Sequence, residues 1–473
     1  MPLTLADFER DALPTLETYA TIPCQSPAYD PDWASNGHLE AATELLASFA
    51  SHLTFEAGDV TVHRLEGRTP VLCVTIEATT DDEETDDDRG TVILYGHLDK
   101  QPPLLPWSEG LHPYTPVRRG DQLFARGVAD DGYSTFAALL AIEAMEREGV
   151  AHPRCVVLIE ASEESGSPDL EAYLDHLKAK LGQVELMICL DSGALTYDRL
   201  WVTTSLRGVL NLNVTVEVLE RGVHSGLGSG VVPSSFLVLR QLLDRIENPE
   251  TGAIVLPELS CEIPAHVTIA AEAVATEFGD VAAADLPAVD GLRFLGDSSA
   301  DRILRRTWRP TLSVVGIDGL PHPDKAGNVL RPFTTATLSL RLPPAVDAAK
   351  ALDAVRTAMT TDVPHGARVT VSNEAAADGW SSPAMATWLE TAAQDASQAA
   401  FGKPAGFTGE GGTIPFLASL GKRYPGVQFV ATGVLGPNSN AHGIDEMLDL
   451  PTAVAVTNSV ATILSAFTTR NDQ

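Results

Sequence analysis

Cysteine is scarce in this sequence and never occurs in close pairs. The chain has five cysteines among 473 residues, an odd number, and no CxxC motif. Such a scattered set predicts reduced thiols rather than a disulfide framework. We expect these thiols to lie in the core of a cytoplasmic protein: Cys24, Cys73, Cys155, Cys189 and Cys261.

Long hydrophobic runs are also missing. The N-terminal segment carries acidic residues early and has no apolar stretch of the kind found in secretory signals. No run approaches the ~18 uninterrupted apolar residues of a typical membrane-spanning helix. We therefore expect neither a secretory signal nor a membrane partner.

Positive charge is sparse. The chain has 32 basic against 64 acidic residues, which gives a net charge of −32. This charge repels phosphate backbones and anionic membranes, so nucleic acid is excluded as a partner. The excess acid is typical of a well-solvated surface. The acidic run at 79–90 is likewise predicted to be a solvated loop, because flexible acids have no fixed metal-binding geometry.

Hydrophobic residues make up 44% of the chain, which is enough to form real cores, and its length suggests two domains. Up to residue 203, short β-rich runs alternate with helical patterns. This alternation predicts an α/β domain with a mainly parallel central sheet flanked by helices. The runs are 70–78, 90–99, 154–162 and 185–193 for strands and 133–149 for a helix.

From residue 204 the pattern changes to strands with period-two alternation around a few helices, which indicates an α+β domain with its own core. Helix and strand patterns of the first kind return after 376. We therefore predict one domain made of 1–203 and 377–473, with a second domain, 204–376, inserted into it.

Histidine and carboxylate side chains follow several of the predicted strands. His97 and Asp99 end one strand, Glu163 and Glu164 follow another, and Asp191 follows a third. Ligands of open α/β sheets bind at this edge. Two further candidates lie outside the strands: Asp130, which with Asp131 opens a helix between glycines, and His442 in a Gly/Asn-rich loop.

Each candidate has an ordinary explanation when taken alone, such as a core histidine or an acidic helix cap. Together they form the ligand set of a paired divalent-metal site. We expect His97 and Asp191 on one ion, Glu164 and His442 on the other, and Asp130 between them. Asp99 is expected to hold the second nitrogen of His97.

Glu163 is left without a ligand role in this scheme. Its carboxylate is therefore the expected general base, which takes a proton from a metal-bound water and passes it to a leaving amine. The metal is expected to generate the hydroxide nucleophile at neutral pH.

Seven motifs in order resemble the di-zinc peptidase and deacylase family of carnosinase, cytosolic nonspecific dipeptidase, glutamate carboxypeptidase and acetylornithine deacetylase. The resemblance covers nearly the whole chain and favours the carnosinase-like dipeptidases. Lys100 stands where an apolar residue is more frequent, and Thr413 where serine is common. The motifs are "YGHLDKQPP", "ARGVADDGYS", "EASEESGS", "CLDSG", "RGVHSGLGSG", "GEGGTIP" and "GPNSNAHGIDE".

The resemblance implies two divalent metal ions per subunit, with zinc expected and manganese or cobalt as alternatives. It also implies a cis peptide between Asp130 and Asp131. The inserted domain would serve as a lid and dimerisation domain. His224 would reach the active site of a partner subunit in a homodimer and stabilise the oxyanion there.

Arg341, supported by Asn328, is the predicted binder of a terminal carboxylate, because a planar guanidinium suits that group. Thr413 is the third predicted substrate-binding residue. The predicted function is hydrolysis of dipeptides or short peptides. An N-acyl-amino-acid deacylase of the acetylornithine or succinyl-diaminopimelate type is the alternative, and the sequence does not separate the two.

Overall fold

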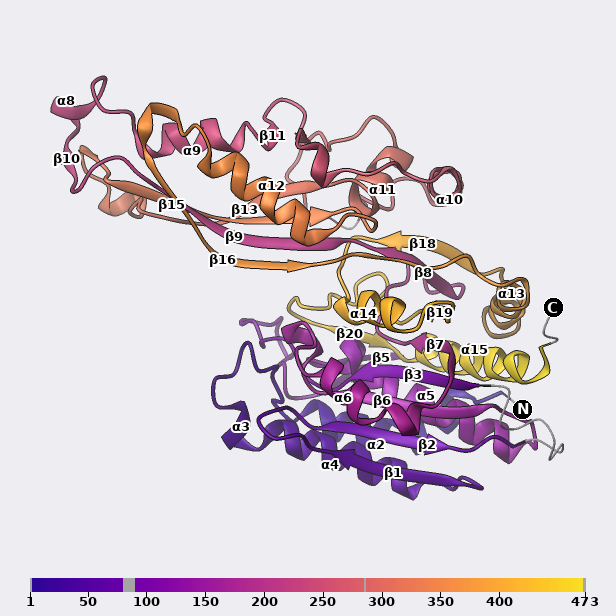
Figure 1. The fold of residues 1–473 in the computed structure, drawn as a ribbon. Helices are drawn as coiled ribbons and strands as arrows, with labels where there is room; N and C mark the ends of the chain where they lie inside the picture. Colours follow the sequence, from indigo (N-terminus) through magenta and orange to yellow (C-terminus); the bar gives the residue numbers. More distant parts are fainter. Residues whose placement is uncertain (1, 80–89, 285, 471–473) are drawn as a thin grey trace. The chain divides into compact units, whose positions relative to one another are not determined.

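The computed structural model describes residues 2–79, 90–284 and 286–470 (Figure 1). The acidic run predicted as a solvated loop lies almost wholly outside these residues. The chain forms two compact units. The sequence prediction placed the domain boundaries at 203/204 and 376/377. The first unit comprises Met1–Thr204, Ser382–Thr408 and Ser419–Gln473, and the second comprises Ser205–Ser381 and Gly409–Ala418.

The first unit is built on a mainly parallel central sheet, as predicted. Four neighbouring strands in the order β6-β3-β7-β19 run parallel, and β1 and β2 extend the sheet on the β6 side with antiparallel pairing. Strand β3 is buried along its whole length, as expected for a strand covered on both faces. The strands are β1 (Gly58–His63), β2 (Val71–Ile76), β3 (Thr91–His97), β6 (Arg154–Glu160), β7 (Val184–Cys189), β19 (Gln428–Ala431) and, antiparallel to β19, β8 (Trp201–Leu206).

Helices cover this sheet. The predicted helix at 133–149 is α5 (Tyr133–Arg147), which is apolar nearly all round and packs against β3 and β6. Helix α4 packs against β1 and β2. The other helices of this unit include α1 (Leu5–Asp11), α2 (Leu13–Ala20), α3 (Trp33–Asn36), α4 (His38–His52), α6 (Leu170–His176), α7 (Lys178–Leu181), α13 (Thr387–Phe401) and α15 (Leu450–Thr469).

Helix α15 is long and apolar enough, by length and composition, to cross a membrane. However, 67% of its apolar window is buried inside the protein, and the helix lies against α5 and α13. Its apolar residues therefore have a structural explanation as part of the core of the first unit.

The second unit has a four-stranded antiparallel sheet in the order β13-β15-β9-β16. Burial alternates along β9 and β15, and the buried side chains face α9 and α12. This is the predicted α+β pattern. The main elements are β9 (Gly208–Glu217), α9 (Ser235–Leu243), α10 (Ala265–Phe278), α11 (Ser299–Thr307), β13 (Thr311–Asp318), β15 (Phe333–Leu342), α12 (Ala348–Thr360) and β16 (Arg368–Ala377).

The two edge strands of this sheet differ in chemistry. Strand β13, which the sequence patterns did not predict, exposes Val314, Val315 and Ile317, with Val315 63% exposed. The opposite edge, β16, exposes polar residues such as Asn373 and Glu374. An apolar sheet edge is a surface on which another strand can pair.

Candidate metal centre

The parallel register of the central sheet gathers the predicted ligands at one edge. His97, the last residue of β3, pairs with Glu160 at the end of β6, and Tyr95 pairs with Cys189 at the end of β7. The segments that follow β6 and β7 carry Glu163, Glu164 and Asp191. They therefore begin beside His97, because parallel strands end at the same edge of a sheet.

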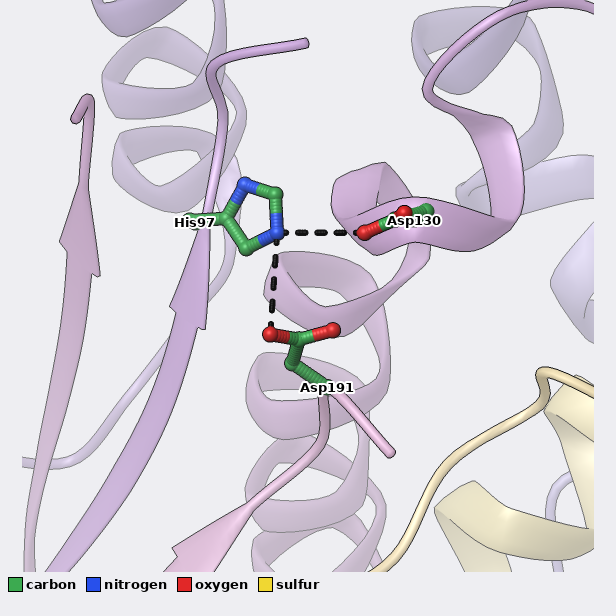
Figure 2. A group of neighbouring side chains, drawn as sticks. All are labelled: His97, Asp130 and Asp191. Carbon is green, nitrogen blue, oxygen red and sulfur yellow. Dashed lines mark ion pairs between the residues drawn. The ribbon is translucent and has the colours of Figure 1, made fainter. Parts of the chain in front are cut away.

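Three buried side chains form what we call the inner group: His97, Asp130 and Asp191. The Nε2 atom of His97 lies 3.3 Å from Oδ1 of Asp130 and 3.7 Å from Oδ2 of Asp191 (Figure 2). Asp130 comes from the turn before α5, so three separate segments converge on one point.

Asp130 also belongs to a second cluster, the outer group, with Glu164 and His442. The Nε2 atom of His442 lies 2.9 Å from Oδ2 of Asp130 and 3.3 Å from Oε2 of Glu164. The His442 side chain is 57% exposed. The two carboxylate oxygens of Asp130 thus face different groups.

The donor set fits two divalent cations. Among the described residues, Nε2 of His97 and Oε1 of Glu164 are buried and have no hydrogen-bond partner, which is costly unless a ligand occupies them. Burial raises the pKa of Asp191 to about 7. Partial desolvation of the His442 ring opposes its protonation, yet Asp130 and Glu164 raise its pKa to about 11. Carboxylates crowded in this way need cations, and imidazole with carboxylate suits zinc, manganese or cobalt.

Glu163 is buried beside the inner group and is not a member of either group. Burial, followed by the charges of Asp191 and Glu164, raises the pKa of its carboxyl group. Its neighbour Glu164 accepts a hydrogen bond from Gln101 at 2.6 Å, a contact that the sequence argument missed. The two adjacent glutamates therefore have separate environments.

Asp99 contacts both the metal-ligand candidate His97 and the turn that carries Glu163 and Glu164. Its main-chain oxygen lies 3.0 Å from Nδ1 of His97, closer than its carboxylate oxygen at 3.4 Å. The carboxylate accepts the backbone N–H groups of Glu163 (3.1 Å) and Glu164 (3.0 Å). Asp99 thus fixes the turn that carries both glutamates. Its main-chain oxygen, and not the carboxylate as predicted, makes the hydrogen bond to the second nitrogen of His97.

The peptide bond between Asp130 and Asp131 is cis, as the resemblance implies. Asp131 is fully buried, and its Oδ2 atom accepts the backbone N–H of His97 at 3.1 Å. It therefore supports the ligand strand and is not itself a member of either metal group.

The unexpected Lys100 is fully buried and has a structural role. Its ammonium group donates to the main-chain oxygens of Tyr19 (3.0 Å), Ala20 (3.3 Å) and Ile22 (2.9 Å), and it lies 4.1 Å from the centre of the Tyr19 ring. Two of these oxygens belong to the last turn of α2, where a cation is favourable. Lys100 thus fixes the N-terminal helices to the segment after His97.

Two predicted substrate-binding residues meet in the second unit. Arg341, on the face of β15 away from α9 and α12, donates to the hydroxyl of Thr413 at 2.9 Å. Arg207 lies close to both Arg341 and Arg306. Burial, together with the positive charges of Arg341 and Arg306, lowers the pKa of Arg207 to about 10. Within residues 2–79, 90–284 and 286–470, no carboxylate forms an ion pair with any of these three arginines.

The other two second-unit candidates lie in a short arm made of β10 (Val223–His224), α8 (Ser225–Gly228) and β14 (Val329–Leu330). His224 is exposed, and the main-chain oxygen of Asn328 accepts the N–H of Ser225. The arm joins the Phe333 end of β15 (Figure 1). At about 3.3 Å per residue, Arg341 lies roughly 26 Å further along the strand. The structure therefore does not bring His224 and Arg341 together within one unit.

The whole chain is similar to known peptidases in sequence and in fold. The family model described as peptidase family M20/M25/M40 matches residues 93–466. The cysteinylglycine-S-conjugate dipeptidase of Corynebacterium striatum is 27% identical over 88% of this chain and 92% of its own. The Cys-Gly metallodipeptidase dug1 of Schizosaccharomyces pombe is 27% identical over 84% of this chain and 83% of its own. The crystal structure of human carnosine dipeptidase 1 has the same fold, with a TM-score of 0.74 and 20% identity over 98% of both chains.

Proposed function

Because the chain belongs to peptidase family M20/M25/M40, a family of metal-dependent hydrolases, we propose that it cleaves the amide bond of dipeptides with two divalent cations bound. The observation that carries the proposal is the pair of ligand groups sharing Asp130, with Glu163 beside them. Zinc is the expected metal. The relatives named above are dipeptidases, which favours this substrate class over N-acyl amino acids.

In this function, the inner and outer groups would each hold one cation through imidazole nitrogen and carboxylate oxygen. Bound cations supply Lewis acidity, which polarises the scissile carbonyl and makes water acidic enough to lose a proton near neutral pH. Glu163 accepts the proton of the attacking water and delivers it to the leaving amine. The Asp99 carboxylate holds Glu163 in place by accepting the backbone N–H of Glu163. The Asp131 carboxylate holds His97 in the same way, by accepting the backbone N–H of His97.

Arg341 is proposed to bind the free carboxylate of the dipeptide. The supporting observation is charge: Arg207, Arg306 and Arg341 gather in a strongly acidic protein without an ion-paired carboxylate among the described residues. A desolvated arginine group of this kind favours a planar anion. Thr413 orients Arg341 through its hydroxyl. Asn328 and His224 are proposed to contact the same substrate from the arm.

A homodimer is part of the proposal. Arg341 and the arm lie at opposite ends of β15, so a partner chain is the simple source of the second contact. The apolar edge strand β13 supports this, because it offers a surface for pairing with a second copy. His224 would then act in the active site of the partner. All five cysteines are free thiols, which supports a cytoplasmic location.

The test is a hydrolysis panel. Protein depleted of metal and reconstituted with zinc, manganese or cobalt is assayed against dipeptides, amidated dipeptides and N-acetyl amino acids, with bound metal measured alongside. We expect metal-dependent cleavage of dipeptides with a free carboxylate. Full activity without detectable metal would contradict the proposal, and preferential cleavage of N-acetyl amino acids would favour the deacylase.

A further inference from the structure

A buried ion pair lies beside the outer group without belonging to it. Arg126 and Glu446 are both almost fully buried, and Nη1 of Arg126 lies 2.8 Å from Oε2 of Glu446. The same carboxylate accepts three backbone N–H groups, from Gly127 (2.9 Å), Ala129 (3.0 Å) and Asp130 (3.2 Å). The donors come from one segment, and that segment ends at the ligand shared by both groups.

Arg126 also reaches the loop that carries His442. Its Nη2 atom donates to the main-chain oxygen of Gly443, the residue next to the ligand. Strand β20 (Met447–Asp449) pairs with β5 (Gln122–Phe124), with Met447 opposite Phe124. This register places Glu446 next to the start of the Arg126 segment. One buried pair thus connects the backbone at Asp130 with the backbone at His442.

The loop around His442 needs such an external constraint. Four of its non-glycine residues have positive φ. Asn, Asp and His tolerate this region better than other L-residues but still adopt it at a cost, so the loop benefits from contacts that hold its shape. They are Asn438, Asn440, His442 and Asp445. The inner group has no comparable weakness, because His97 ends a buried strand and Asp191 closely follows another.

We propose that Arg126 and Glu446 act as a clamp that sets the position of His442 relative to Asp130, and thereby the metal affinity of the outer group. Both are positioning residues, since neither belongs to a ligand group. The inference rests on the proposed function, because it assumes that the two groups bind cations. Partners that orient metal ligands contribute about 10–100-fold to metal affinity.

The experiment is a calorimetric titration of metal-free, full-length protein with zinc, repeated with cobalt to record its absorption spectrum. Reference variants His97→Ala and His442→Ala assign the two binding steps to the inner and outer groups. Glu446→Gln keeps the size of the side chain but removes the charge that receives four donors. We expect it to weaken the step lost in His442→Ala by about 10–100-fold. The other step should weaken clearly less, because it shares Asp130 but does not depend on the His442 loop.

Glu146→Gln is the matched control. Glu146 also accepts a backbone N–H, from Glu56, and lies 3.2 Å from Nε2 of buried His152. It lies near the far end of α5, roughly 20 Å from the first residue of that helix, Tyr133, at about 1.5 Å per residue. This change removes a similar carboxylate and should alter neither binding step.

A second variant protects the test against misfolding. Arg126→Met leaves the three amide contacts of Glu446 in place, and it removes both the ion pair with Glu446 and the hydrogen bond to Gly443. We expect the same preferential loss at the outer group from it. Equal weakening of both steps, or unchanged affinities in folded variants, would overturn the clamp. Failure of the proposed function is separately visible, because the unmutated protein would then bind fewer than two cations.

Discussion

The two units of this protein each contain a cluster of like charge. In the first unit, three carboxylates and two histidines converge at the edge of the parallel sheet, and the shared Asp130 connects their two ligand groups. In the second unit, Arg207, Arg306 and Arg341 gather without an ion-paired carboxylate among the described residues. Among the described residues, the arginine cluster has no ion-paired carboxylate to compensate its desolvation. In the acidic cluster, two imidazoles face three carboxylates, so part of the negative charge stays uncompensated.

This contrast suggests different roles for the two clusters: hydrolysis for the acidic cluster and substrate recognition for the arginine cluster. In the proposed function, cations would complete the acidic cluster and supply Lewis acidity, and an anion such as a substrate carboxylate would complete the arginine cluster. A change in the first cluster should therefore act on turnover or metal content. A change in the second should act on the choice of substrate. The predictions below test whether the two clusters can be separated in this way.

The largest effect is expected from Glu163→Gln. The variant keeps both ligand groups, so metal content should stay at the level of the unmutated protein. Turnover should fall by about 10²–10⁴-fold, because the attacking water loses its proton acceptor. Steady-state kinetics with metal analysis on the same samples measures both quantities. Turnover above about a tenth of the original would show that Glu163 is not the base.

The neighbouring glutamate provides the control. Glu164→Gln removes a ligand of the outer group, so it should lower bound metal as well as turnover. If both variants lost metal equally, the separate roles of Glu163 and Glu164 would be wrong.

A smaller but measurable effect is expected from mixing two inactive variants. If His224 acts in a partner subunit, a dimer of His224→Ala with Glu163→Gln contains one intact active site. Random co-assembly should therefore restore about a quarter of the sites in a two-fold dimer. Activity after co-expression, compared with each variant alone, measures this. Mixtures no more active than their components would place His224 outside the partner's site.

The assembly itself has an independent check at the two sheet edges. Val315→Lys places a charge on the apolar edge β13 and should shift the sedimentation coefficient towards the monomer. Asn373→Lys places the same charge on the polar edge β16 and should not. Dissociation by both variants, or by neither, would argue against pairing through β13.

A substrate-dependent effect is expected at the arginine cluster. Arg341→Lys keeps the charge but loses the planar fork, so kcat/KM for dipeptides should fall by about 10–100-fold. Amidated dipeptides, which lack the carboxylate, should be affected much less. Thr413→Ser is the matched control, because it keeps the hydroxyl that accepts from Arg341. Equal losses on both substrate classes would mean that Arg341 does not recognise the carboxylate.

The sequence predicts the first unit well, for a physical reason. Strand ends of a parallel sheet meet at one edge, so His97, Glu163 and Asp191 can be placed together from local patterns alone. Ion pairs between residues far apart in the chain are harder to predict from the sequence. The Arg126–Glu446 pair is an example, because local patterns show only that Glu446 is an acidic residue shortly after His442.

The second unit is less predictable. Strand β13 was missed because it is an exposed edge with a bulge after Val314, so its side chains do not alternate cleanly between polar and apolar. Neither Arg207 nor Arg306 can be identified as functional from the sequence. What distinguishes them is the lack of an ion-paired carboxylate among the described residues, and this is visible only in the folded structure. The separation of His224 from Arg341 likewise depends on the direction of β15.

The smallest effect is expected at Lys100, the buried lysine of the first unit that stands where an apolar residue is more frequent. Replacing Lys100 by Met removes the ammonium but keeps a similar length. At neutral pH, we expect a modest change in unfolding free energy, because the cost of burying the charge offsets the three lost hydrogen bonds. Two of the carbonyl oxygens, those of Tyr19 and Ile22, also keep a backbone donor.

The pH dependence of this difference gives the sharper test. Burial lowers the pKa of Lys100 below 10.5 in the folded protein, while the unfolded chain holds its proton up to that value. At pH values between the lowered pKa of the folded protein and 10.5, the unfolded state binds more protons at Lys100. The unfolding free energy of the unmutated protein should therefore rise with pH in this window. Lys100→Met lacks this contribution. Urea denaturation of both metal-free proteins should therefore show a stability difference that shifts in favour of lysine as pH rises through the window. A difference independent of pH would mean that the ammonium is not destabilised by burial, and that the carbonyl oxygens at the end of α2 fully compensate its desolvation.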